Sequence, residues 1–284
     1  MKIRKVVALG VIGALAAGTL GLTACGPRKT TGNGSTGELS GALTVAGSDT
    51  MVNMAQAWAE EFMAENQGVS IAVKGGGSGT GIAALINGTI DIADASREMK
   101  PEEKTKLPDA VGTPVARDGI AVIVNPANTV EDISKDDLGK IYRGEITNWK
   151  DVGGADAPII LISRDSSSGT YEYFKEAVVG KDAEFAKSAK LLPSTQAIVD
   201  EVKANPNAIG YIGVGYESAD IKVVKLDGVA SSVATVLDGS YGLSRDLFVY
   251  TAKAPTGLAK TYIDWILSDA GQKIVKDQGF VPLP

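Results

Sequence analysis

The sequence predicts an α/β fold, in which mainly parallel sheets are flanked by helices. The first observation behind this prediction is an alternation of short apolar runs, typical of strands, with longer amphipathic segments, typical of helices. The second is a set of three loops rich in Gly, Ser and Thr, at 47–50, 75–81 and 164–170. Each loop follows a predicted strand and opens a predicted helix. We therefore expect the three loops to gather at the carboxyl ends of the strands, where ligands bind in open α/β sheets.

The individual elements follow from local patterns of apolar residues. Strands are expected at 43–46, 69–73, 90–93, 120–124, 159–163, 208–212 and 247–251. Helices are expected at 51–62, around 82–86, and at 138–142, 171–179, 198–203 and 258–267. The helix at 51–62 has the clearest pattern, because its apolar residues recur every three to four positions. No repeat of solenoid period is present in the sequence.

The N-terminal 25 residues have the pattern of a bacterial lipoprotein signal peptide. A basic start with Lys2, Arg4 and Lys5 precedes an apolar run over 6–22, and the small residue Ala24 then comes directly before Cys25. The alternative is a single membrane-spanning helix, because the run approaches spanning length. We expect residues 1–25 to be the signal with its lipobox cysteine, and Cys25 to be lipidated. The protein would then be exported and anchored to the membrane on its extracytoplasmic face, with 26–38, rich in Gly, Ser and Thr, as a flexible tether.

The composition of the 284-residue chain excludes several kinds of chemistry. It has no histidine and one cysteine, which removes the usual Ser-His-Asp and Cys-His arrangements and all histidine metal ligands. We expect neither a metal nor a cofactor. The net charge is −6, and it becomes −9 without the first 24 residues, which carry three positive charges. An acidic body argues against nucleic acid as a partner. It does not argue against a small anion, which backbone amides and one arginine can bind.

The three loops are suited to such an anion. Helix N-termini present unpaired amides, glycine lets the backbone approach a ligand closely, and serine or threonine hydroxyls add donors. In the loop 164–170, Arg164 adds a rigid fork of donors. Purely structural alternatives exist for each loop. The segment 75–81 could be only a tight strand–helix turn, and Ser168 could cap a helix beside a surface pair of Arg164 and Asp165.

Longer motifs resemble the phosphate-binding (PstS-type) family. They are GGGSGTG at 75–81, DIADASRE at 91–98, DGIAVIVNP at 118–126, IYRGEITNWKDVGG at 141–154, SRDSSSGTYEYF at 163–174, STQAIVDEV at 194–202 and NAIGYIGVGY at 207–216. The resemblance implies a two-lobed, class II periplasmic-binding-protein fold that closes around orthophosphate. It also implies a monomeric, non-enzymatic protein that delivers phosphate to the permease and ATPase of an ABC importer. The expected lobes are 39–117 plus 245–284, and 118–244, joined by crossing strands.

The resemblance also implies a set of binding residues. Four loops would supply Asp49, Thr50, Ser78, Ser96, Arg97, Arg164, Ser168, Gly169 and Thr170. In the family an aspartate of the third loop accepts the proton of phosphate, and fully deprotonated sulfate is thereby excluded. Here that position is Ser96. We hypothesise that Asp49 takes over as acceptor, with Ser96 as a donor and Arg97 as a second positive charge or a partner of Asp49. Asp118 is the alternative acceptor, and a helix cap is the alternative role of Asp49.

Three other functions remain open at this point. The protein could bind another oxyanion, such as sulfate, molybdate or tungstate. It could be a serine-type hydrolase or phosphatase that uses Ser168 or Ser78, although the lack of histidine argues against this. It could also be an adhesin or signalling lipoprotein that keeps the fold without a transport role.

Overall fold

The computed structural model describes residues 39–284, which lie within one compact unit. The predicted signal peptide, Cys25 and the tether lie outside the described residues. Within residues 39–284, no helix is long and apolar enough to cross a membrane.

Ten strands form a mixed sheet, in the order β2-β1-β3-β10-β4-β8-β6-β7, with β9 paired to β4 and β5. The strands are β1 (Ser40–Gly47), β2 (Gly68–Lys74), β3 (Ile92–Ala95), β4 (Val111–Val124), β5 (Asp132–Ile133), β6 (Ile160–Arg164), β7 (Lys190–Leu192), β8 (Ala208–Gly213), β9 (Lys222–Leu226) and β10 (Ser244–Thr251). The outer strands pair in parallel, whereas β4 and β10 run antiparallel to each other and to β8 and β3.

Helices cover the sheet on both sides of the two central strands. They are α1 (Val52–Glu65), α2 (Ser78–Ile86), α3 (Pro101–Lys106), α4 (Lys135–Arg143), α5 (Gly169–Phe174), α6 (Thr195–Ala204), α7 (Val233–Leu237), α8 (Gly257–Ile266) and α9 (Asp269–Asp277). Short 3₁₀ helices lie at η1 (Trp149–Val152) and η3 (Val214–Tyr216), and α5 continues into a π-helical turn, η2 (Lys175–Val179).

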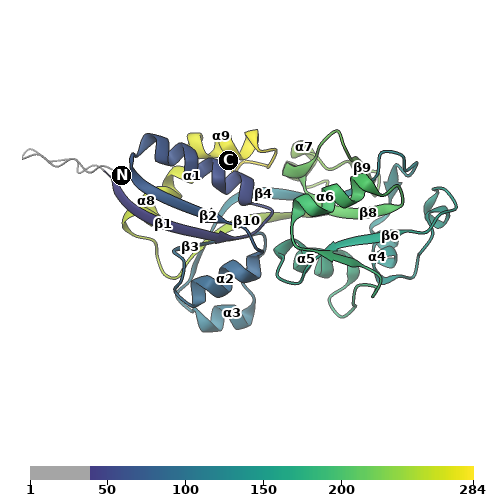
Figure 1. Ribbon diagram of the computed structural model, residues 1–284, viewed down its shortest axis with the longest axis horizontal. Helices are drawn as coiled ribbons and strands as arrows, with labels where there is room; N and C mark the ends of the chain where they lie inside the picture. Colours follow the sequence, from purple (N-terminus) through teal and green to yellow (C-terminus); the bar gives the residue numbers. More distant parts are fainter. Residues whose placement is uncertain (1–38) are drawn as a thin grey trace, which may run out of the picture. The chain divides into compact units, whose positions relative to one another are not determined.

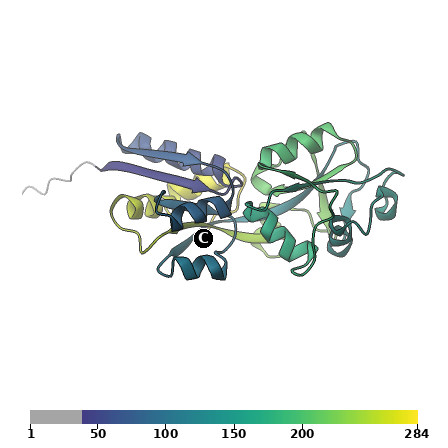
Figure 2. The same ribbon diagram turned by 60° about the horizontal axis from the view of Figure 1, so that its bottom comes forward.

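The two strands β4 and β10 connect two groups of elements. In Figures 1 and 2, β1–β3 with α1–α3, α8 and α9 lie on one side of these strands, and β6, β8 and β9 with α4–α7 lie on the other. The sequence predicted only the end of β4, at 120–124. Its first half was missed because Gly112, Pro114 and the charged Arg117 and Asp118 interrupt the apolar run that is typical of a buried strand. The structure has a strand or helix at each of the other predicted places.

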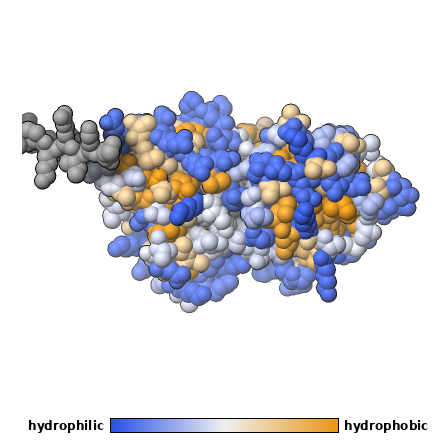
Figure 3. All heavy atoms as spheres, in the orientation of Figure 1, coloured by the Kyte–Doolittle hydropathy of each residue, from blue (hydrophilic) through white to orange (hydrophobic). Residues whose placement is uncertain are grey.

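Aromatic residues organise the core in both groups. On one side, α1 buries Trp58 and Phe62; the Trp58 indole donates to the carbonyl of Gly271 at 2.8 Å, and Phe62 packs edge-on against Tyr262. Full burial of such a side chain stabilises the fold by roughly 1.5–3 kcal/mol. On the other side Phe174 stacks on a buried tyrosine of β8 at 3.8 Å between ring centroids. Figure 3 shows hydrophilic side chains over much of one face, with apolar patches between them.

The core also contains the carboxyl group of Asp94. Asp94 lies on β3 and is 3 % exposed. Burial raises the pKa of Asp94 to about 8. The folded protein therefore keeps a proton on Asp94 at pH values where the unfolded chain has lost it.

This difference predicts a pH-dependent stability. Between pH 4 and pH 8 the unfolded state binds fewer protons than the folded state, so Asp94 makes the fold less stable as pH rises. Each pH unit inside this window would cost up to about 1.4 kcal/mol. Asp94→Asn should remove the effect, so the variant should gain stability relative to the parent between pH 5 and pH 8. Urea unfolding at pH 5 and pH 8 measures the free energy of unfolding of both proteins. If this free energy changes with pH equally in parent and variant, the prediction is wrong.

Candidate anion-binding site

The structure brings the predicted loops together at the carboxyl ends of β1, β2, β3 and β6. Backbone hydrogen bonds connect them: Gly77 donates to the carbonyl of Gly47 at 2.8 Å, and Gly79 donates to the carbonyl of Ser167 at 2.9 Å. Gly77 has φ of +97°, and a side chain there would lie within 2.6 Å of the backbone of Ser167. The loops from both sides of the crossing strands are therefore in direct contact.

Four hydroxyl groups meet where these loops converge. Thr50 and Thr170 share a hydrogen bond of 2.8 Å between their Oγ1 atoms, and the Oγ atoms of Ser78 and Ser96 are 3.3 Å apart. All four residues are at most 2 % exposed. A Cβ added to Gly169 would lie 2.3 Å from Ser78 Oγ and 2.6 Å from Ser96 Oγ, so only glycine fits there. Five of the predicted site residues thus form one buried cluster, which we call the hydroxyl cluster.

Ser168 caps α5 beside this cluster. Its Oγ accepts hydrogen bonds from the amides of Thr170 at 3.2 Å and Tyr171 at 3.3 Å. The capping role considered from the sequence is therefore real. It leaves the hydroxyl proton of Ser168 free to donate to another acceptor.

Arg164, at the end of β6, is 2 % exposed. Its Nη1 donates to Thr195 Oγ1 at 2.9 Å and its Nη2 to the carbonyl of Pro193 at 3.0 Å. Its Nε is buried without a partner among the described residues. Burial lowers the pKa of Arg164, although the nearby carboxylates of Asp49 and Asp165 oppose this shift. An arginine remains charged in such surroundings.

Asp49 points toward the same arginine. Its Oδ2 accepts a hydrogen bond from the amide of Thr195 at 2.6 Å and lies 3.7 Å from Arg164 Nη1. Thr195 is the first residue of α6, where a carboxylate is favoured by the unpaired amides and the helix dipole. Asp49 therefore joins the loop after β1 to a helix on the other side of the crossing strands.

One pairing considered from the sequence is wrong. Arg97 does not pair with Asp49; its two terminal nitrogens each donate to Glu103, both at 2.8 Å. Glu103 belongs to α3, a six-residue helix with no buried residue. Burial raises the pKa of Glu103, but hydrogen bonds from Arg97 and the Lys100 amide lower it overall. The sequence contained no apolar pattern that would have revealed this helix or its contact with Arg97.

Comparisons with known proteins identify the family of this chain. A family model described as "PBP superfamily domain" matches residues 30–270. The phosphate-binding protein PstS of Bacillus subtilis is 38 % identical over 92 % of this chain and 89 % of its own length. The PstS of Pseudomonas aeruginosa is 33 % identical over 87 % of this chain and 84 % of its own. The chain belongs to the PstS family of phosphate-binding proteins.

Solved structures confirm the fold expected of a PstS-family chain. A putative phosphate ABC transporter substrate-binding protein from Clostridium perfringens, solved with bound phosphate, has a TM-score of 0.83 at 36 % identity. The match covers 86 % of this chain and 100 % of that one. An ABC-type phosphate transport receptor from Vibrio cholerae has a TM-score of 0.73 at 28 % identity, covering 85 % of this chain and all of that one. The predicted α/β periplasmic-binding-protein fold is confirmed.

A buried ion pair beside the hydroxyl cluster was not predicted for this PstS-family chain. Arg245 on β10 donates from Nη2 to Asp118 Oδ2 at 2.8 Å and to Thr170 Oγ1 at 2.8 Å. Asp118 also accepts from the amide of Val214 at 3.1 Å. Burial raises the pKa of Asp118, and Arg245 opposes the shift. Both oxygens of Asp118 are thus already bonded. Arg245 was missed because it lies within a strand and not in one of the Gly/Ser loops.

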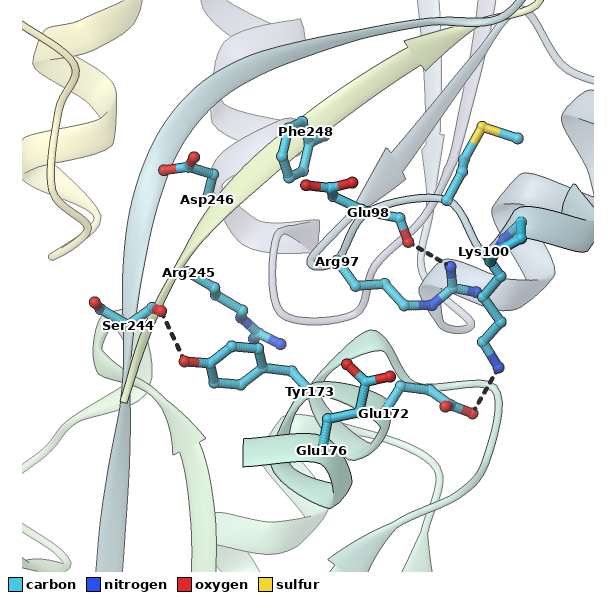
Figure 4. Close-up of a pocket in the computed structure, with 12 residues that line it drawn as sticks. Arg97, Glu98, Lys100, Glu172, Tyr173, Glu176, Ser244, Arg245, Asp246 and Phe248 are labelled. Atoms are coloured by element: carbon cyan, nitrogen blue, oxygen red, sulfur yellow. Dashed lines mark hydrogen bonds and ion pairs between the residues drawn. The ribbon is translucent and has the colours of Figure 1, made fainter. Parts of the chain in front are cut away.

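An open cavity of about 420 Å³ adjoins Arg245, which contacts the cluster through Thr170 (Figure 4). Arg97 enters it from the segment after β3, and Arg245 from β10, while Glu172, Tyr173 and Glu176 face them from α5 and η2. Lys100 pairs with Glu172 across the cavity at 3.0 Å. No group of three or more potential metal ligands occurs among residues 39–284.

Proposed function

We propose that this chain binds inorganic phosphate outside the cytoplasm and delivers it to an ABC importer. The observation that carries this proposal is the buried hydroxyl cluster next to Arg164, in a fold that matches the phosphate-bound relative at a TM-score of 0.83. Four hydroxyls and an arginine are donors suited to the oxygens of a small oxyanion. The PstS family consists of transport receptors without enzymatic activity, and we assign none to this chain.

The proposed ligands are the residues expected from the family. They are Asp49, Thr50, Ser78, Ser96, Arg97, Arg164, Ser168, Gly169 and Thr170. Micromolar binding requires about 8 kcal/mol. Hydrogen bonds to charged groups contribute about 1.5–3 kcal/mol each, so several of them suffice even after the loss of ligand freedom.

The proposed site has no excess of positive charge. Its three arginines are all paired: Arg97 with Glu103, Arg164 with Asp49, and Arg245 with Asp118. Each arginine therefore has a carboxylate neighbour before any anion arrives. Binding would then depend on hydrogen bonds aimed at the anion more than on net charge.

We further propose that phosphate is enclosed by closure of two lobes, 39–117 plus 245–284 and 118–244. Both boundaries fall on the crossing strands β4 and β10. Contacts between the loops of the two lobes support a closed arrangement, since Gly79 donates to the carbonyl of Ser167 and the Ser167 hydroxyl donates to the carbonyl of Gly76. A ligand that contacts both sides would shift the population toward this form.

The proposed site of membrane attachment is Cys25. The basic start, the apolar run and Ala24 before Cys25 support lipidation at this residue, with 26–38 as the tether. Mass spectrometry of the N-terminal peptide from membrane-extracted protein should show an acyl-modified Cys25. An unmodified cysteine in a mature chain would contradict this part of the proposal.

The phosphate assignment is tested by calorimetry on the purified mature protein with phosphate, arsenate, sulfate and molybdate. We expect strong binding of phosphate and at least 100-fold weaker binding of sulfate, because a carboxylate at the site repels an anion that carries no proton. Heat with sulfate or molybdate but none with phosphate would overturn the assignment.

A further inference from the structure

The crossing strands β4 and β10 carry two neighbouring ion pairs of opposite orientation. In the antiparallel ladder Asp118 lies opposite Arg245, and Arg117 lies opposite Asp246. Successive residues of a strand point to opposite faces of a sheet. The Asp118–Arg245 side chains are 0 % and 4 % exposed, whereas those of Arg117 and Asp246 are 50 % and 42 % exposed. One pair therefore faces the proposed site and the other faces solvent.

The buried pair is connected to the hydroxyl cluster by hydrogen bonds. Asp118 accepts from Arg245, Arg245 donates to Thr170 Oγ1, and Thr170 Oγ1 shares a hydrogen bond with Thr50 Oγ1. Thr50 and Thr170 come from loops of different lobes. The guanidinium group of Arg245 thus reaches the point where the two lobes meet.

Several contacts fix the position of this guanidinium group. Asp118 Oδ2 accepts from its Nε at 3.2 Å as well as from its Nη2, and its Cζ lies 5.5 Å from the centroid of the Tyr173 ring. Tyr173 is itself held by a hydrogen bond of 2.7 Å from its hydroxyl to the carbonyl of Ser244. A group held on several sides loses little freedom when it binds a ligand.

One nitrogen of this group lacks an acceptor. Arg245 Nη1 is buried and has no hydrogen-bond partner among residues 39–284. Burying a charged donor without an acceptor is costly, and such atoms in folded proteins usually have a partner that has to be identified. An anion in the hydroxyl cluster would lie beside Thr170, which Nη2 of the same guanidinium group already contacts. It would supply the missing acceptor.

We propose that Arg245 is a further anion-binding residue, donating from Nη1 to the bound anion, and that Asp118 positions it. This inference rests on the proposed phosphate site. It assigns Asp118 to holding Arg245 through Oδ2, while Oδ1 accepts from the Val214 amide, so both oxygens of Asp118 already have partners. Both residues lie on the crossing strands β4 and β10. The anion would therefore be bound by these strands as well as by the loops.

Calorimetric titration of phosphate into four proteins tests this proposal. Arg245→Gln should weaken binding about 10- to 100-fold, the range expected for a lost hydrogen bond to a charged group. Arg245→Lys should lie between the parent and Arg245→Gln, since it keeps the charge but loses the planar fork. Arg117→Gln, which removes the arginine of the exposed neighbouring pair, is the matched control and should stay within twofold of the parent.

A second variant and a second readout separate ligand contact from folding. Arg245→Gln leaves Asp118 buried without its partner, so the double variant Asp118→Asn/Arg245→Gln removes both charges together. We expect it to fold and to show a smaller rise in Tm on adding phosphate than the parent does. In the unmodified protein, ¹⁵N-arginine NMR should show a change at the Arg245 guanidinium group when phosphate binds.

The outcomes distinguish this inference from the proposed function. If the parent binds phosphate, and Arg245→Lys and the double variant bind it within threefold of the parent, the inference is overturned while the proposed function stands. Unchanged Arg245 guanidinium resonances at saturating phosphate would overturn it as well. If the parent itself binds no phosphate, the proposed function fails first.

Discussion

Replacing Arg164 with alanine is expected to weaken phosphate binding at least 100-fold and to weaken sulfate and arsenate binding to a similar extent. The guanidinium group is 2 % exposed, and its Nε has no partner among the described residues. Two charge-assisted hydrogen bonds, at about 1.5–3 kcal/mol each, correspond to roughly 10²- to 10⁴-fold in affinity. The loss is unselective because an arginine binds any oxyanion. Calorimetry with each anion measures it.

Arg164 also holds the segment before α6, and the controls separate this role from anion binding. Its Nη groups donate to Pro193 and Thr195. Thr195→Val removes one of these acceptors and keeps Arg164, so it should lower Tm without a 100-fold loss of affinity. Arg143→Ala is the matched arginine control, since Arg143 pairs with Glu145 and donates to the carbonyl of Val179. An Arg164→Ala variant that still binds phosphate like the parent would contradict the assignment of Arg164.

The loops could be predicted from the sequence because their signals are local. A strand followed by Gly, Ser and Thr and then by a helix is visible within some fifteen residues, and Thr50, Ser78 and Thr170 meet as this pattern implies. Ser96 was predicted only through the family resemblance. Its contact with Ser78 depends on the pairing of β1 with β3, which places the end of β3 beside the start of α2.

The ion pairs around the loops could not be predicted in the same way. Arg245 and Asp118 are far apart in the sequence and meet only through the register of β4 and β10. Arg97 pairs with Glu103 on α3, which is polar on all sides and therefore lacks the periodicity that identifies a helix. The sequence gives no sign that Asp94 is buried, because its burial results from tertiary packing around β3. Such positions depend on tertiary register, which a single sequence does not display.

Asp49→Asn tests how the site would distinguish phosphate from sulfate. The Asp49 carboxylate accepts from the Thr195 amide at 2.6 Å and lies 3.7 Å from Arg164. An asparagine oxygen can accept the same amide proton, so the substitution preserves this contact and removes the charge. If Asp49 accepts the phosphate proton, the variant should bind phosphate more than 10-fold more weakly and sulfate no more weakly than the parent. Its selectivity for phosphate should therefore fall.

Two further variants distinguish recognition of the phosphate proton by the Asp49 charge from a purely structural contact between the loop after β1 and α6. Asp49→Ala removes both the charge and the contact with Thr195, so it should weaken phosphate binding more than Asp49→Asn does. Asp165→Asn changes the other carboxylate near Arg164, one that accepts from the Ser167 amide at 2.9 Å, and should leave the selectivity within threefold of the parent. If Asp49 only joins the loop after β1 to α6, Asp49→Asn will keep the parent's selectivity and Asp49→Ala will weaken both anions equally. Competition calorimetry with phosphate and sulfate on the three variants decides between a proton acceptor and a structural contact.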